Sequence, residues 1–186
     1  RRLYVSDGEG LSGTVMNGIY EPEQLVKFQD RVFMLGYATH NATGIKQLFQ
    51  AQISTGNVTV ATFDTTAHSA KALIAAAGKL FFVEPTLDGQ EQLQCVLADL
   101  TLPAAPKFSL DASGTGITQL TASSGHVYFS AREFDHPLAK RVLWGSDGTL
   151  AGTTALPFSS TGIENPQLLG SLDDRCIFWC VSHYGD

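Results

Sequence analysis

Basic residues and long apolar segments are scarce in this sequence of 186 residues. Lysine and arginine total 12 and are scattered along the chain, against 18 aspartates and glutamates, for a net charge of −6. Phosphate groups are bound by clustered basic side chains, so this charge gives no support for a nucleic-acid partner. No apolar run reaches the roughly 18 residues of a membrane-spanning helix. We therefore expect neither a nucleic-acid-binding protein nor a membrane span.

Cysteine is also scarce, and its odd count limits disulfide pairing. The three cysteines cannot all pair within the chain. Cys176 and Cys180, if they share a strand, lie on one face about 13 Å apart, which is too far for a disulfide bond. Cys95 can reach one of them only if the fold brings distant strands together. The sequence favours three buried free thiols, and the count does not decide the redox compartment.

Signatures of helices and of common catalytic sites are missing as well. No window of 11 or more residues shows convincing helical spacing of apolar residues. There is no Gly-x-Ser-x-Gly elbow, no phosphate-cradling loop and no Cys/His cluster with zinc spacing. Eighteen glycines indicate many turns. We expect an all-β protein and predict no cofactor.

The feature that is present is a repeat. Four leucines stand in equivalent places at spacings of 45, 45 and 50 residues: Leu3, Leu48, Leu93 and Leu143. Four apolar segments recur independently at intervals of 48, 47 and 50 residues, each after a turn pair: Val32–Leu35, Leu80–Val83, Val127–Ser130 and Ile177–Cys180. Two anchors with one period indicate repeats at about residues 2–45, 46–90, 91–140 and 141–186.

Each repeat is predicted to hold four short strands. Within the period that begins near Ala70 these are roughly residues 70–77, 79–84, 91–98 and 106–110, with tight polar or glycine-containing links. Four antiparallel strands in every 45 to 50 residues are typical of a blade of a β-propeller. A β-sandwich also has many short strands, but it does not have this fixed period. The sequence therefore predicts a β-propeller-like array within one domain, residues 1–186.

The ends of the chain fall inside repeats. Counted by strands, the chain begins with the last two strands of one repeat and ends with the first two of another. Pairing of the two halves would give a closed four-bladed ring with a two-plus-two seam and would hide the strand edges. The alternative is a segment of a larger propeller. The start at Arg1, without methionine, favours a fragment or a processed piece.

A short turn motif occurs near both ends. Ser6-Asp7-Gly8 follows Leu3-Tyr4-Val5, and Ser146-Asp147-Gly148-Thr149 follows Val142-Leu143-Trp144. This pattern resembles the bacterial ELWxxDGT repeat proteins, and it is degenerate in the two middle repeats. The resemblance implies a secreted or cell-surface chain of propeller-like repeats, with no defined activity and no catalytic residues.

The Asp-Gly pair is predicted to be a structural turn. Glycine adopts positive φ at little cost, and aspartate bonds its own backbone. A calcium loop needs several oxygen ligands, whereas each turn offers one carboxylate, with Glu9 adding a second only in the first copy. A sialidase-type Asp box has a different spacing. If the strand near Ala70 is innermost, the turn joins the third strand to the fourth, at the opposite end from the predicted ligand loops.

The loops between second and third strands are predicted to form the binding face. They cover residues 37–46, 84–91, 131–141 and the segment after Val181, and they differ in length and composition. Their polar residues are the candidate ligand-binding residues: His40, Asp88, Asp135, His136 and His183, with Tyr184 beside the last. Around a common axis they would suit a metal or acid–base site. The simpler interpretation is that loops are polar.

The leading functional hypothesis is a non-catalytic extracellular or cell-surface module that binds a protein or a glycan, or builds an assembly. The first alternative is a glycan-cleaving hydrolase or lyase whose active site lies in the same loops. Carboxylates and histidines converging on one axis would favour that enzyme. The second alternative is a structural subunit of a large surface or filament complex, which a large apolar outer patch would support.

Overall fold

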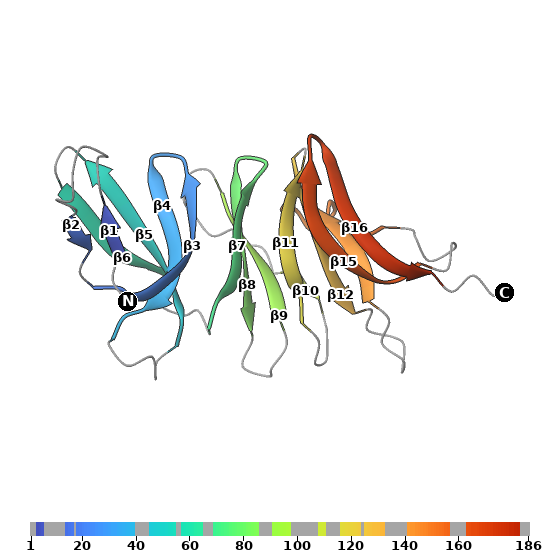
Figure 1. Ribbon diagram of the computed structural model, residues 1–186, viewed down its shortest axis with the longest axis horizontal. Helices are drawn as coiled ribbons and strands as arrows, with labels where there is room; N and C mark the ends of the chain where they lie inside the picture. The colour runs from blue at the N-terminus through green and yellow to red at the C-terminus, as the bar shows by residue number, and fades with distance from the viewer. Residues whose placement is uncertain are drawn as a thin grey trace. The chain divides into compact units, whose positions relative to one another are not determined.

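The computed structural model is built from β-strands (Figure 1). It describes residues 3–5, 14–16, 18–39, 45–54, 57–64, 69–85, 91–97, 108–110, 116–123, 125–132, 141–156 and 163–182. All regular secondary structure in these ranges is β-strand, so the predicted all-β class is confirmed. No helix in the described ranges is long and apolar enough to cross a membrane.

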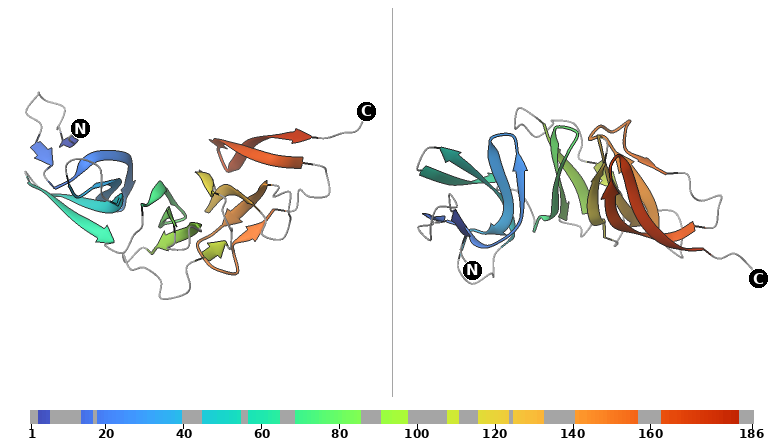
Figure 2. Two further views of the ribbon diagram at one scale, coloured as in Figure 1. Left: turned by 90° about the horizontal axis from the view of Figure 1, so that it is seen from below. Right: turned by 45° about the horizontal axis from the view of Figure 1, so that its top comes forward.

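Three antiparallel sheets of four strands follow one another along the chain, each with its strands in sequence order (Figures 1 and 2). The first contains β3 (Tyr20–Phe28), β4 (Arg31–Tyr37), β5 (Gln47–Ser54) and β6 (Asn57–Asp64). The second contains β7 (Lys71–Ala76), β8 (Lys79–Pro85), β9 (Glu91–Val96) and β10 (Phe108–Leu110). The third contains β11 (Thr118–Ser123), β12 (His126–Arg132), β13 (Arg141–Ser146) and β14 (Thr154–Ala155).

Two-stranded sheets stand before and after these three in the sequence. The first pairs β1 (Leu3–Val5) with β2 (Thr14–Met16), and the last pairs β15 (Ile163–Leu172) with β16 (Arg175–Ser182). In the described residues three four-stranded sheets thus stand between two two-stranded ones, in the order that the strand count predicts. That the two-stranded sheets are halves of a repeat stays a prediction. In the second four-stranded sheet the predicted strand limits differ from the observed ones by at most two residues, and Pro106 lies outside the described residues.

The two repeating features of the sequence, the apolar segments and the leucines, pair with each other in the sheets. The last residue of each apolar segment pairs with the leucine of the third strand, giving Leu35 with Leu48, Val83 with Leu93, and Ser130 with Leu143. All six residues are buried. The period found in the sequence thus corresponds to one ladder position that repeats from sheet to sheet.

Tight turns join the first and second strands, as predicted. Ala77 and Gly78 have φ of 53° and 67°, the two positive values of a type I′ hairpin turn. Gln29 and Asp173 also have positive φ in the corresponding turns of the first and last sheets, at 57° and 53°. These turns match the right-handed twist of the strands that they connect, so they fix the register of each hairpin.

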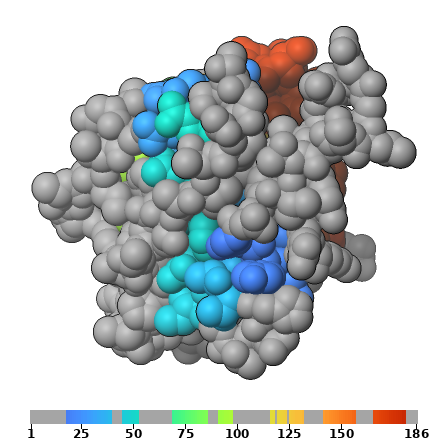
Figure 3. Space-filling model, turned by 90° about the vertical axis from the view of Figure 1, so that its left-hand side faces the viewer, coloured from blue at the N-terminus to red at the C-terminus, as the bar shows by residue number. Residues whose placement is uncertain are grey.

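The chain divides into two compact units, residues 1–73 and 74–186, with the division inside β7. In the first unit Ile19, Met34, Phe49 and Ala51 form a buried cluster, and Val32 packs against it. Phe28 and Phe33 meet edge to face with ring centroids 6.1 Å apart. Described strands of this unit, blue to cyan, also reach the surface in Figure 3. In β4 the consecutive residues Phe33, Met34 and Leu35 are all fully buried, so this strand is buried on both faces.

The second unit has its own buried residues. Leu80, Phe81, Phe82 and Val83 of β8 are fully inaccessible to solvent. In the third sheet the Phe129 ring stacks on Trp144 with centroids 6.4 Å apart. Burial of each large apolar side chain contributes about 1.5–3 kcal/mol. The second strands β8 and β12 are accordingly the centres of their sheets.

Candidate binding face at one end of the sheets

All five predicted site residues lie outside the described residues: His40, Asp88, Asp135, His136 and His183. Their grouping around a common site therefore stays a prediction. The structure does describe the strand ends from which their loops leave. These ends are Tyr37 and Lys46, Pro85 and Glu91, and Arg141 at the start of β13.

The three loops leave equivalent positions. Residues 38–46, 86–90 and 133–140 each join the second strand of a four-stranded sheet to the third. Because neighbouring strands are antiparallel, the links that lead into β7 and β11 belong to the same end of the sheets. We call this the loop end, and we call the other end, with the turns at 29–30 and 77–78, the hairpin end. The predicted equivalence is confirmed for the positions of these three loops in the topology, and the fourth, after Val181, runs into residues outside the described ones.

Hydrogen bonds at the loop end tie each repeat to the next. The backbone N–H of Ala70, just before β7, donates to the carbonyl of Lys46, just before β5, over 3.0 Å. The N–H of Ile117, just before β11, donates to Glu91 Oε2 at the start of β9 over 2.5 Å. In both junctions the start of a third strand holds the start of the next first strand. Each of these hydrogen bonds fixes the start of one sheet against the third strand of the sheet before it.

Arg141 serves the third sheet in a similar way. Its Nη1 donates to the carbonyl of Gly116 at 2.9 Å and to the carbonyl and hydroxyl of Ser130 at 3.2 and 3.3 Å. Its backbone N–H lies 3.4 Å from the Asn165 side-chain carbonyl on β15, which accepts a hydrogen bond. Arg141 therefore binds the start of its own sheet and also contacts the next hairpin.

A charged and aromatic cluster lies at the loop end of the first sheet. Lys46 Nζ forms an ion pair with Glu23 and lies 5.9 Å from the centroid of the Tyr37 ring. Tyr37 also pairs with Tyr20 across the ladder. Aromatic rings beside charged groups suit the recognition of polar ligands that carry apolar faces, such as sugars and peptides. The loop of residues 38–46 leaves from this cluster.

A buried carboxylate lies beside the second loop. Glu84 is 3% exposed, and its Oε2 accepts a hydrogen bond from Gln94 Nε2 over 2.9 Å. Buried acids are uncommon unless they are paired or functional. The sequence prediction missed Glu84, although a charged residue directly after four apolar ones in Leu80–Val83 was a usable signal.

The described residues were also compared for clusters of metal-binding side chains. In the described ranges no three His, Cys, Asp or Glu side chains gather closely enough to hold a metal ion.

The Asp147-Gly148 turn lies at the hairpin end, between β13 and β14, as predicted. The Asp147 carboxylate accepts hydrogen bonds from the Thr149 hydroxyl at 2.7 Å and the Thr149 N–H at 2.8 Å. These bonds, the hydroxyl bond first, hold the pKa of Asp147 below its usual value. The carboxylate therefore stabilises its own loop. Further bonds inside the loop join Ser146 Oγ to Thr153 Oγ1 at 2.6 Å and the Gly152 N–H to Thr149 Oγ1 at 3.0 Å.

The same turn also docks on the preceding sheet. Lys79 Nζ, at the start of β8, donates to the carbonyl of Asp147. A Cβ atom on Gly148 would lie 2.8 Å from Lys79 Cδ and 2.9 Å from Cys95 Sγ. Only glycine fits this approach, and its φ of 85° adds a second reason. The motif is thus a contact between sheets as well as a turn.

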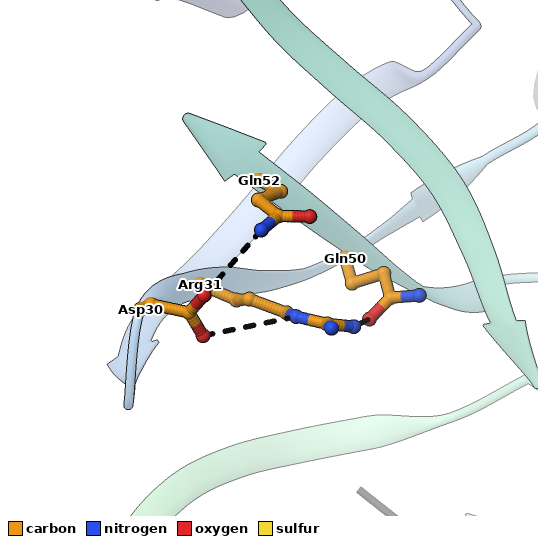
Figure 4. A network of polar contacts seen from close by, with 4 residues as sticks. All are labelled: Asp30, Arg31, Gln50 and Gln52. Atoms are coloured by element: carbon orange, nitrogen blue, oxygen red, sulfur yellow. Dashed lines mark hydrogen bonds and ion pairs between the residues drawn. The ribbon is translucent and has the colours of Figure 1, made fainter. Parts of the chain in front are cut away.

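A polar network at the hairpin end of the first sheet spans two strands (Figure 4). Arg31 Nη1 donates to Gln50 Oε1 over 2.6 Å, and Arg31 Nε lies 3.8 Å from Asp30 Oδ1. Gln52 Nε2 donates to Asp30 Oδ2 over 3.4 Å. These contacts connect the start of β4 to β5 and help to fix the register between the two strands.

The three cysteines are free, as the sequence favours. Cys95 is buried, and burial raises the pKa of its thiol, although Lys79 works in the opposite direction. Cys176 and Cys180 do share β16. The expectation that all three are buried is wrong, because these two are only half-buried on the last, two-stranded sheet.

Comparisons with known proteins leave the family open. Searches of protein-family models and of curated proteins find no match. Among solved structures, the N11 neuraminidase-like protein of A/flat-faced bat/Peru/033/2010 (H18N11) is similar to this chain with a TM-score of 0.47 and 16% identity. The match covers 91% of this chain and 50% of that one, so this chain spans about half of its length. Function is therefore inferred below from this chain's own residues.

Proposed function

We propose that this chain is a non-catalytic, propeller-like module that binds a protein or a glycan through the loops at its loop end. The observation that carries the proposal is the contrast between constant sheets and variable loops. The three whole sheets share strand order and the paired anchor residues. The loops at residues 38–46, 86–90 and 133–140 leave the same position but differ in length and sequence. Variable loops on a rigid scaffold are a common basis of binding specificity.

Charged side chains at the strand ends next to these loops already have partners within the sheets. Glu91 and Arg141 bind backbone groups at the start of the third sheet. Lys46 pairs with Glu23 within the first sheet. In this proposal the strand ends stabilise the frame, while His40, Asp88, Asp135, His136 and His183 contact the ligand.

The proposed arrangement is a β-propeller-like array within one domain, with β1–β2 and β15–β16 each forming half of a further four-stranded sheet. Sheets of four antiparallel strands in sequence order are the units of propellers. The resemblance of the Asp-Gly motif to ELWxxDGT repeat proteins supports an extracellular or cell-surface location.

The test is an array that carries oligosaccharides and purified extracellular proteins. The labelled wild-type chain is compared with a triple variant, His40→Ala, His136→Ala and His183→Ala. We expect at least a tenfold loss of binding with an unchanged melting temperature. The matched control is His126→Ala, because this exposed histidine starts β12 at the hairpin end. Binding that survives the triple change but is lost in the control would contradict the proposal.

Fluorogenic glycosides, assayed with the same variants, separate binding from catalysis. The proposal predicts no turnover above the buffer rate for any of them. Turnover by the wild-type chain that the triple variant abolishes would replace the module by the glycan-cleaving enzyme.

A further inference from the structure

The charged residue at the beginning of each third strand has a different role in the first sheet than in the other two. Lys46, Glu91 and Arg141 occupy this place at intervals of 45 and 50 residues. The Glu91 side chain accepts a hydrogen bond from the Ile117 N–H, and the Arg141 side chain donates one to the carbonyl of Gly116. Both of these side chains therefore hold the start of β11.

In the first sheet the backbone makes this kind of contact instead. The carbonyl of Lys46 accepts the hydrogen bond from the Ala70 N–H, just before β7. The Lys46 side chain takes no part in that bond. It lies within its own sheet, where Nζ forms an ion pair with Glu23 and is 5.9 Å from the centroid of the Tyr37 ring. The junction between repeats therefore does not account for the position of this side chain.

The side chains of this cluster lie on one face of the first sheet. Tyr20 stands opposite Tyr37 in the ladder between β3 and β4, and Glu23 stands opposite Leu35, two residues before Tyr37. Residues two apart on a strand share a face. The side chains of Lys46 and Glu23 are 25% and 46% exposed, and Tyr37 is partly exposed. The cluster is thus accessible from solvent beside the first of the three loops.

The chemistry of the cluster suits a neutral sugar. The ion pair offers an ammonium donor and a carboxylate acceptor side by side, and a sugar hydroxyl can accept from the first and donate to the second. The charges of Lys46 and Glu23 compensate each other, so the pair does not favour an ionic ligand. The Tyr37 ring adds an apolar surface for the C–H face of a sugar ring. Addition of a peptide strand needs an open strand edge, and β4 and β5 are paired on both sides.

We propose that this cluster is a binding subsite for a neutral glycan, in which Tyr37 contacts the apolar face of a sugar ring while Lys46 and Glu23 bind its hydroxyl groups. The inference rests on the proposed function and adds the class of the ligand to it, because the loop that carries His40 begins at this cluster. Lys46 differs from the other charged strand ends in that its side chain contacts the ligand as well as its own sheet.

Calorimetric titration of the full chain tests the class of the ligand. The probes are neutral oligosaccharides of glucose, galactose and mannose, and acidic oligosaccharides of glucuronic and galacturonic acid. We expect at least one neutral probe to bind the wild-type chain. Tyr37→Ala should raise its Kd about tenfold or more, because the aromatic contact surface is lost. Lys46→Met should raise it about fivefold or more, because a charged donor is lost. The matched control is Lys27→Met, since Lys27 is exposed on β3 towards the hairpin end and should leave the Kd unchanged.

Nuclear magnetic resonance of the tyrosine rings provides a second measurement on the wild-type chain. The chain has five tyrosines, and the ring signal that is missing from Tyr37→Phe identifies Tyr37. Addition of the neutral oligosaccharide that binds should shift this signal. The signal of Tyr128, identified in the same way with Tyr128→Phe, should stay in place, because Tyr128 lies on β12 towards the hairpin end.

Three results would overturn the proposal. The first is a wild-type chain that binds no neutral oligosaccharide, and the second is binding of acidic oligosaccharides or proteins alone. The third is a neutral probe that binds the wild-type chain, Tyr37→Ala and Lys46→Met alike. The triple histidine variant separates this subsite from the proposed function. Loss of neutral-probe binding in the triple variant but not in Tyr37→Ala rejects the subsite and keeps the role of the loops, whereas loss in Tyr37→Ala alone rejects the loop histidines and keeps the subsite.

Discussion

Asp147 and Gly148 show how single residues join two sheets. The sequence predicts a structural turn here, because an Asp-Gly pair between apolar strands satisfies its own backbone. The Thr149 and Ser146 hydrogen bonds agree with that prediction. The docking of Gly148 against Lys79 and Cys95 was not predictable, because these residues are distant in the sequence and no local pattern marks the contact.

Replacement of Gly148 by alanine should separate these two roles. An L residue at positive φ costs about 1–2 kcal/mol, and overlap of the new methyl group with packed neighbours adds about 1–3 kcal/mol. The control is Gly125→Ala, because Gly125 has φ of 81° but no atom near its Cβ position. Urea unfolding should show a loss for Gly148→Ala that exceeds the loss for Gly125→Ala by at least about 1 kcal/mol. Equal losses would mean that the turn does not dock on the preceding sheet.

The Asp147 carboxylate should make stability depend on pH. Its pKa in the folded chain is lowered, chiefly by the Thr149 hydroxyl, so its contribution is present above the unfolded pKa of about 3.9. That contribution is lost as pH falls through the folded pKa. Wild type should exceed Asp147→Asn in free energy of unfolding at pH 6, by less than about 1 kcal/mol because the group is exposed. The difference should shrink as the pH is lowered below the unfolded pKa, and a difference that stays constant as the pH falls would contradict this role.

At the scale of elements, the buried residues at the junctions between sheets could not be predicted from the sequence. Ile19, Ala70 and Ile117 each precede the first strand of a sheet and are at most 2% exposed. They repeat at the same period as the two anchors, but single apolar residues among polar neighbours give no periodic signal. The strands themselves were predictable, because their apolar and β-branched runs are bounded by turn residues.

The junction before β11 offers a test of coupling between sheets. Glu91→Ala would leave the N–H of the buried Ile117 without its acceptor, which costs about 1–3 kcal/mol. Glu91→Gln keeps an acceptor oxygen and should retain most of the stability that Glu91→Ala loses.

Lys46→Ala should cost less than about 1 kcal/mol, because Ala70 is held by the Lys46 backbone and the side chain makes a partly exposed ion pair with Glu23 and a contact with the Tyr37 ring. Thermal unfolding of the three variants measures this order, and equal losses for Glu91→Ala and Glu91→Gln would contradict the junction.

At the scale of the whole chain, a repeat frame accounts for the sheets and for the places of the loops together. The period was predictable from Leu48, Leu93 and Leu143 because each occupies one ladder position in its sheet. The ligand was not predictable, since loop residues such as His40 and His136 follow no structural period. The exposure of Trp179 also needed the structure, because its sequence matches a buried core strand.

Amide hydrogen exchange of the intact chain tests this repeat frame most directly. The account predicts that protection is highest in the second and third strands of each four-stranded sheet, because both are paired on both sides. The protected second strands then recur at Val32–Leu35, Leu80–Val83 and Val127–Ser130. Fast exchange is expected at the intervening turns, including residues 29–30 and 77–78. Three maxima at spacings of 48 and 47 residues would support the frame. Protection spread without that period, or concentrated outside the second and third strands of these sheets, would contradict it.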